Sequence, residues 1–211
     1  MTIDKHGSFI SEGPRYSVLQ CRGPVRYRQT LASDRGVICY AEAHLNASSN
    51  PKAQHGFVIA GSTTPKSTEE WADAYLSRIA ETFGVKTYGV KKGIRGSGNV
   101  HWVKWPTPTM LLEPLFVSDP IMAARITSGE GLDALGRCLA GSIRATFPDG
   151  GLVGLSIGHA YRGTGDGGAN VARMDIDGDG EVDEPDPAFD QEAELCEAYV
   201  DAATEILTEI K

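Results

Sequence analysis

Short apolar segments alternate with longer amphipathic segments along most of this chain, and this alternation constrains the fold more than any other feature. Runs of apolar and small residues predict five strands, at 16–21, 37–43, 56–60, 109–113 and 152–157. Nearly continuous apolar strands of this length are typical of parallel sheets that are covered on both faces. The sequence therefore predicts an α/β fold, a single three-layer domain with a mainly parallel twisted sheet.

The segments between these strands carry helical periodicity. A helix is compatible with residues 25–34, and a leucine-rich pattern around 132–143 predicts another. Residues 68–83 place five apolar side chains at helical spacing: Trp71, Ala74, Tyr75, Ile79 and Phe83. Ser67 and Glu70 before this run predict a capping box.

The last part of the chain predicts a helix that starts near 188. Its apolar residues share one face: Leu195, Cys196, Tyr199, Ala203, Ile206, Leu207 and Ile210. By contrast, residues 86–98 are rich in glycine and lysine, and this composition predicts a loop.

Composition excludes several classes of protein. The chain has 211 residues, of which 41% are hydrophobic and 23% charged, which is typical of one globular domain spanning 1–211. No apolar run approaches the roughly 20 residues of a membrane span, and the first residues lack the apolar core of a signal peptide. The four cysteines form no CxxC pair, so neither a zinc ribbon nor a redox motif is expected and the thiols predict a reduced compartment.

The net charge of −8 is concentrated in one segment. Residues 175–197 hold 11 of the 28 acidic residues and no lysine or arginine. The rest of the chain carries 17 acidic residues against 20 basic ones, so it is mildly basic. A block of like charge is either a solvated stretch or a cation site, and the pattern within it distinguishes the two.

Acidic residues alternate in this segment as in an EF-hand loop, with Gly180 at the turn in position 6. Ca²⁺ takes six to eight oxygen ligands, which closely spaced carboxylates supply. The pattern predicts a structural calcium site at 175–186, formed by Asp175, Asp177, Asp179, Glu181, Asp183 and Asp186. The alternative is an acidic loop without a metal, because position 12 holds Asp instead of Glu and residues 163–173 are rich in glycine rather than helical.

A second set of chemically active residues follows the predicted strands. His44, Glu113 and His159 lie at strand ends, and Glu192 lies at the front of the last helix. The carboxyl ends of strands in an open α/β sheet are where binding sites assemble. Two imidazoles and one carboxylate make a three-ligand zinc site with an open position, and a further carboxylate can act as general base. Spacing alone leaves an alternative, in which the histidines are structural and Glu192 is a solvated first-turn acid.

Three stretches carry a resemblance to a known family. AEAHLNAS (41–48) resembles the motif S-I-H-A-N-A of the zinc-dependent N-acetylmuramoyl-L-alanine amidases, the cell-wall amidase family 3. PTMLLEPLFVSDP (108–120) is similar to its P-A-V-L-V-E-x-G-F-x-S-N, and LSIGHAYRGTGDGGANV (155–171) to its D-P-G-H-G-G-x-D-x-G-A. The resemblance implies the phosphorylase/hydrolase-like amidase fold.

The order of these motifs departs from the family. The G-H motif opens the domain in the family, whereas here it follows the L-L-E motif. The resemblance therefore implies a circular permutation, in which residues 152–210 correspond to the first strand and helix of the family. The turn ATFPDGGL (145–152) would join the old termini, and the calcium-type loop would be an insertion between two zinc ligands.

The resemblance also implies roles for individual residues. His44 and His159 resemble the histidine ligands of zinc, and Glu113 resembles the catalytic glutamate that takes the proton of the attacking water. For the third ligand Glu192 is preferred to Glu194, because it shares the buried face of the last helix. The sequence also departs from the family within the motifs: Ser156 replaces the aspartate before the G-H pair, Ala160 and Tyr161 replace the two glycines after it, Glu42 replaces a small polar residue, and Asp119 replaces an asparagine.

The activity implied is hydrolysis of the amide bond between N-acetylmuramic acid and L-alanine in bacterial peptidoglycan. Substrate contacts are expected from residues 89–99 and 101–105. The resemblance and the start of the sequence predict a phage or prophage endolysin, made in the host cytoplasm without a signal peptide and acting on the wall after release. No nucleic acid, membrane or obligate protein partner is expected. Two alternatives stay open: a catalytically inactive calcium-dependent wall-binding protein, and a zinc amidohydrolase of the same fold that acts on a small peptide-like substrate.

Overall fold

One seven-stranded sheet organises the computed structural model, which describes residues 3–50, 53–93, 106–159 and 191–209. The strand order is β1-β2-β7-β3-β6-β4-β5. The strands are β1 (Phe9–Ser11), β2 (Tyr16–Cys21), β3 (Cys39–Ala43), β4 (His55–Ala60), β5 (Lys86–Lys92), β6 (Thr109–Glu113) and β7 (Gly151–Ile157). Only the β1–β2 and β4–β6 pairs are antiparallel among the described strands, so the prediction of a mainly parallel sheet is confirmed.

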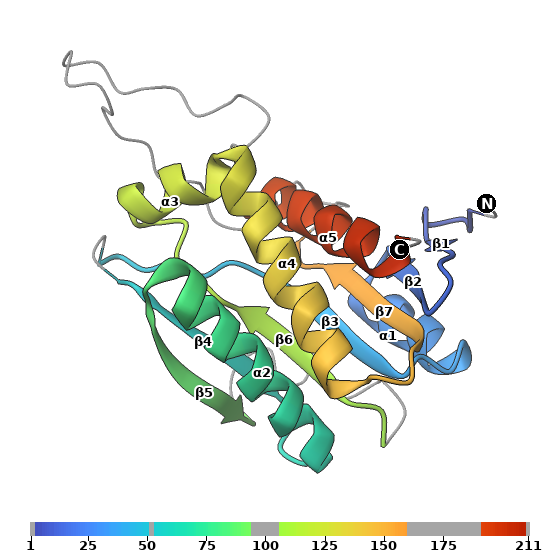
Figure 1. Ribbon diagram of the computed structural model, residues 1–211. Coiled ribbons are helices and arrows are strands. Elements are labelled where there is room, and N and C mark those ends of the chain that lie inside the picture. The colour runs from blue at the N-terminus through green and yellow to red at the C-terminus, as the bar shows by residue number, and fades with distance from the viewer. Residues whose placement is uncertain (1–2, 51–52, 94–105, 160–190, 210–211) are drawn as a thin grey trace.

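Helices cover both faces of the sheet, which confirms the three-layer prediction (Figure 1). One face carries α1 (Val25–Asp34). The opposite face carries three longer helices, α2 (Lys66–Phe83), α4 (Gly129–Thr146) and α5 (Glu192–Thr208). The short α3 (Pro120–Thr127), which was not predicted, precedes α4. None of the helices in the described part of the chain has the length and apolarity that a membrane span needs.

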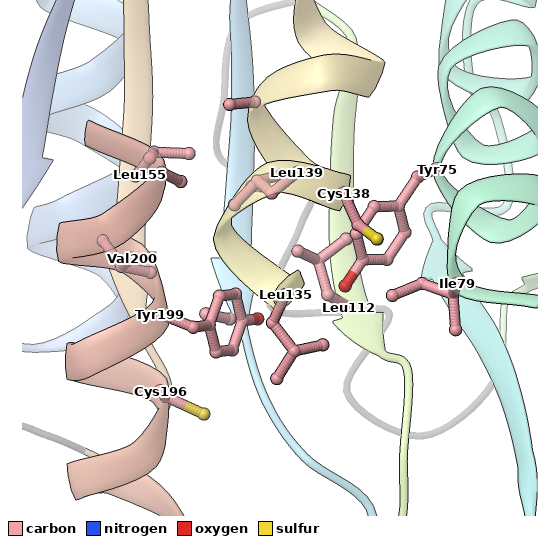
Figure 2. Packing of buried hydrophobic residues seen from close by; sticks show 14 of the residues in the cluster. Tyr75, Ile79, Leu112, Leu135, Cys138, Leu139, Leu155, Cys196, Tyr199 and Val200 are labelled. Atoms are coloured by element: carbon pink, nitrogen blue, oxygen red, sulfur yellow. The ribbon is translucent and has the colours of Figure 1, made fainter. Parts of the chain in front are cut away.

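The main hydrophobic core lies between the sheet and the three long helices (Figure 2). Tyr199 of α5 and Leu135 of α4 pack over the sheet there, and Leu112 of β6 contributes from the sheet itself. A smaller cluster on the α1 side joins Leu19, Cys21, Ala32, Val37 and Tyr40. All four cysteines are buried free thiols. The apolar strands predicted from sequence are therefore buried against the three long helices on one face, and the strands near α1 are buried on the other face as well.

The loop predicted at 86–98 is wrong for its first half, because Lys86–Lys92 form the edge strand β5, parallel to β4. An edge strand has only one neighbour and keeps part of its surface in water, so it needs few apolar residues. The many lysines of this segment concealed it in the sequence, and lysine on an edge strand opposes pairing with other chains. Residues 94–98 lie outside the described residues.

The capping box predicted at Ser67 is also wrong. The α2 helix already begins at Lys66, with Pro65 as its N-cap residue and no side-chain capping bond. Proline has a fixed φ and no N–H group, so it can precede the first turn without a capping side chain. Glu70 instead forms an i,i+4 ion pair with Lys66, in which Nζ and Oε1 are 2.9 Å apart.

The topology brings three strand ends to one edge of the sheet. β7 lies between β2 and β3, and β3 also pairs in parallel with β6. The helix that follows β2 lies on one face, and the next described element after β7, the α5 helix, lies on the other. Such a reversal of strand order leaves a crevice beyond the carboxyl ends of the central strands. The candidate site lies there.

Candidate metal centre

The structure brings together His44, His159 and Glu192, which the sequence places far apart. His44 directly follows β3, His159 follows β7, and Glu192 is the first residue of α5. One possible ligand atom from each side chain lies within 4.8 Å of the other two. Glu192 Oε1 is 3.1 Å from His44 Nδ1 and 3.9 Å from His159 Nε2. The two imidazole rings are nearly perpendicular, with centroids 4.9 Å apart.

This donor set fits a zinc ion. Nitrogen and oxygen ligands lie about 2.0–2.2 Å from tetrahedral zinc, which places the ligand atoms about 3.3 Å from one another. The measured separations of 3.1 and 3.9 Å lie on either side of that value. The Glu192 side chain is 5% exposed and that of His159 33% exposed, so the cluster is buried on one side and open to solvent on the other. A metal bound here would keep a position free for water or substrate.

Glu192 is held in place by the backbone as well as by histidine. The Leu45 N–H donates a hydrogen bond of 3.1 Å to Oε1 of Glu192. A carboxylate at the first residue of a helix is also stabilised by the helix dipole. Glu194, the other candidate ligand, is engaged elsewhere, because its side chain accepts a bond from the Gln191 backbone in a capping box at the start of α5. The structure thus directs Glu192 into the cluster and leaves Glu194 outside it.

Carboxylates surround His44 and make the site strongly favourable for a cation. Burial lowers the pKa of His44, but hydrogen bonds to Glu192 and Glu42 and the charge of Glu113 outweigh burial and raise this pKa to about 10. Burial raises the pKa of Glu42, and the hydrogen bond to His44 together with the charge of Arg28 lowers it to about 2. Without a metal, the positive charge that these carboxylates require is therefore carried by His44.

Glu113, the predicted catalytic residue, lies beside the cluster at the end of β6. In the antiparallel pairing with β4 its Cα partner is Phe57. The Glu113 carboxylate adds to the effect of burial in raising the pKa values of Cys196 and Tyr199, and it also raises that of His44. Its side chain is half-buried. A carboxylate in this position is suited to accept a proton from a molecule that enters the open side of the cluster.

The backbone before His159 passes very close to the His44 ring. A Cβ atom at Gly158 would overlap the imidazole ring of His44, so only glycine fits between the two histidines. His159 itself has a φ of +57°, a left-handed conformation that is uncommon for a residue with a side chain. Backbone strain of this kind costs on the order of 1–3 kcal/mol and is concentrated at functional sites.

We expect Gly158→Ala to displace His44 and to weaken metal binding. Overpacking of a tight site costs about 1–3 kcal/mol, so the melting temperature should fall by several degrees. Differential scanning fluorimetry and titration of the metal-free protein with zinc would measure both effects. Gly141→Ala in α4 is the matched control, because its new Cβ would meet only the flexible side chain of Arg78. An alanine variant at 158 with unchanged zinc affinity would contradict the close approach.

The sequence did not predict a role at the site for Glu42, which contacts His44, or for Arg28, which contacts Glu42. Glu42 Oε1 lies 3.1 Å from His44 Nε2, and Glu42 Oε2 forms an ion pair of 2.9 Å with Arg28 of α1. The sequence did carry a signal for Glu42. It is an acidic residue within an apolar strand, and it lies two positions before His44, so the two side chains share a face. Nothing in the sequence pointed to Arg28.

The remaining predicted residues lie outside the described part of the chain. This applies to the expected aromatic substrate-contact segment at 101–105 and to most of the basic segment at 89–99. It also applies to the whole predicted calcium loop, with Asp175, Asp177, Asp179, Glu181, Asp183 and Asp186. Calcium binding therefore stays a prediction from the sequence.

Comparison with known proteins finds similarity in structure alone. No protein-family model matches the sequence, and no curated protein matches it. The catalytic domain of CwlV, an N-acetylmuramoyl-L-alanine amidase from Bacillus (Paenibacillus) polymyxa var. colistinus, aligns with a TM-score of 0.50 and 15% identity over 61% of this chain and 68% of that one. An N-acetylmuramoyl-L-alanine amidase from Clostridium difficile 630 aligns with a TM-score of 0.53 and 18% identity over 60% of this chain and 67% of that one. The mixed α/β architecture of this protein is thus the fold found in solved structures of N-acetylmuramoyl-L-alanine amidases.

Proposed function

We propose that this protein is a zinc-dependent peptidoglycan amidase, which cleaves the bond between N-acetylmuramic acid and L-alanine. The observation that carries the proposal is the convergence of His44, His159 and Glu192 at the strand ends, with Glu113 beside them. The fold shared with solved amidases supports the same reading. The expected setting, a phage or prophage endolysin, stays a prediction from the sequence.

The site residues have two different roles, metal binding and proton transfer. His44, His159 and Glu192 would hold zinc, which when bound lowers the pKa of a coordinated water toward about 7 and polarises the substrate carbonyl. Glu113 accepts the proton of the attacking water and delivers it to the departing nitrogen of L-alanine. His159 is the more exposed histidine, so the substrate approaches from its side.

The direct test is digestion of purified peptidoglycan. We expect the zinc-loaded protein to release new L-alanine amino termini without new reducing sugar ends, which distinguishes an amidase from a glycosidase. Removal of the metal by a chelator should abolish the release, and added zinc should restore it. Zinc binding without any release from the wall would favour a different amidohydrolase, and the absence of both would favour an inactive wall-binding protein.

We also propose the circular permutation on topological grounds. β7 lies between β2 and β3 inside the sheet, although it comes last in the sequence among the described strands. The segment before β2 lies against the end of α5, since a Cβ at Gly13 would lie 2.6 Å from the Cα of Thr208. A short turn at 147–150 links α4 to β7. The order of the amidase family would therefore result from opening this turn and joining the termini.

A relinked variant is expected to fold. Its new ends would lie between Asp149 and Gly150, and a Gly/Ser linker of about 10 residues, with a mean reach of roughly 17–19 Å, would join the old termini. Circular dichroism should show the same helix content, and zinc titration should give the same affinity as the original chain. A variant with the same linker but with new ends inside α4, next to Gly141, is the control and should not fold. Failure of the first variant alone would contradict the permutation.

A further inference from the structure

A buried line of charged side chains extends from α1 to the candidate metal centre. Arg28 Nη2 lies 2.9 Å from Glu42 Oε2, and Glu42 Oε1 lies 3.1 Å from His44 Nε2. The Arg28 and Glu42 side chains are only 3% and 2% exposed. One carboxylate oxygen of Glu42 thus faces the Arg28 guanidinium group, and the other faces the imidazole ring of His44.

This arrangement determines which nitrogen of His44 is available to a metal. One oxygen of Glu42 pairs with the Arg28 guanidinium group and the other faces a ring nitrogen at 3.1 Å, so the carboxylate accepts a hydrogen bond from that nitrogen, which carries a proton. That nitrogen is Nε2, and the other nitrogen, Nδ1, faces Glu192 at 3.1 Å. A histidine that binds a metal commonly donates its other N–H to a carboxylate, which sets the tautomer and the ring orientation.

Neighbouring groups hold the ion pair in position. Arg28 Nη1 donates a hydrogen bond of 3.1 Å to the Gly23 carbonyl at the start of α1. Glu42 pairs in register with Ser156 of β7, and the Ser156 hydroxyl lies 2.6 Å from the Tyr40 hydroxyl on the same face of the sheet. A buried ion pair replaced by apolar residues often leaves stability unchanged or higher, so stability alone does not account for this one.

We propose that Arg28 and Glu42 are positioning residues, which hold His44 in the tautomer and orientation that present Nδ1 to the metal. This proposal rests on the proposed function, because it takes the metal at this site to be zinc. Arg28 holds the Glu42 carboxylate in place, Glu42 accepts a hydrogen bond from the Nε2–H group of His44, and neither residue touches the metal or the substrate.

The test uses two double variants, because removal of one partner alone would leave a buried charge and destabilise the chain. Arg28→Met with Glu42→Met removes the charges and the acceptor together. Arg28→Met with Glu42→Gln removes the charges and returns a neutral acceptor at the same place. Ile143→Val in the main core is the control for a mild loss of stability that lies away from the site.

Zinc affinity from chelator competition and the ¹⁵N chemical shifts of the His44 ring are the readouts, and the melting temperature of the metal-free protein checks the fold. We expect zinc affinity to fall by about 10- to 100-fold in the Met/Met variant, with a partial return in the Met/Gln variant. The ¹⁵N shifts of the zinc-loaded proteins should show a protonated Nε2 and a metal-bound Nδ1 in the original protein, and a smaller population of this state in the Met/Met variant.

Each outcome decides a separate question. A folded Met/Met variant with unchanged zinc affinity and an unchanged tautomer would overturn the positioning role. An equal loss of affinity in the Ile143→Val control would also overturn it, because the loss would then follow from stability. These measurements need no peptidoglycan, so an original protein that binds zinc with a protonated Nε2 but leaves the wall intact overturns only the proposed function. An original protein that binds no zinc overturns both.

Discussion

The Glu113→Gln variant should lose about 10²- to 10⁴-fold of the wall-hydrolysing activity, which is the usual contribution of a general acid–base residue. Glutamine keeps the shape of the side chain but cannot accept a proton at neutral pH. Glu113 is not among the three clustered ligand candidates, so the variant should bind zinc as the original protein does. Release of L-alanine amino termini measures the activity, and elemental analysis measures the metal.

A matched substitution separates this effect from a general loss of charge. Glu81→Gln removes the same charge from an exposed position on α2 and should leave both activity and zinc content unchanged. If Glu113→Gln retained activity within about tenfold of the original protein, the role of proton acceptor would have to be assigned to another group. If it lost zinc instead, Glu113 would be a ligand.

Glu192→Ala should cause the largest loss of metal. The Glu192 carboxylate contacts both histidines of the cluster and accepts the Leu45 N–H, so its removal takes away one of three ligands. Outer partners of metal ligands typically contribute 10- to 100-fold to affinity, and the loss of a ligand itself should exceed about 100-fold. Competition with a chelator of known affinity would measure this change.

Glu194→Ala is the control on the same helix. Its side chain caps the start of α5 by accepting the Gln191 N–H at 2.9 Å. Loss of a cap costs about 1 kcal/mol of stability, so this variant should melt a few degrees lower and still bind zinc. If zinc were lost from Glu194→Ala and kept by Glu192→Ala, the third ligand would be Glu194.

The central strands could be predicted because burial leaves a clear mark on composition. Residues 109–113 and 152–157 are mostly apolar, and both form largely buried strands inside the sheet. The edge strand β5 was missed because it has a described partner strand on one side alone and its lysines lie at the edge of the sheet. The three-residue β1 was missed as well, because so short a segment shows no pattern.

The chemistry of the candidate site was also partly visible in the sequence. His44, Glu113 and His159 follow strands, and parallel strands bring their carboxyl ends to one edge of a sheet. The choice of Glu192 depended on helical spacing, which placed it on the face that carries Leu195 and Tyr199. Periodicity and strand direction placed these residues together, and the resemblance to the amidase family was needed to assign their roles.

By itself, then, the sequence determined the layered α/β architecture, the central strands and the four residues that converge at their ends. Only the tertiary structure decided that Nδ1 of His44 faces Glu192, that Gly158 permits the two histidines to meet, and that Arg28 reaches Glu42. Periodicity reports which side of an element is buried. It does not report where α1 crosses the sheet, and that crossing is what places a guanidinium group of one element 2.9 Å from a carboxylate of another.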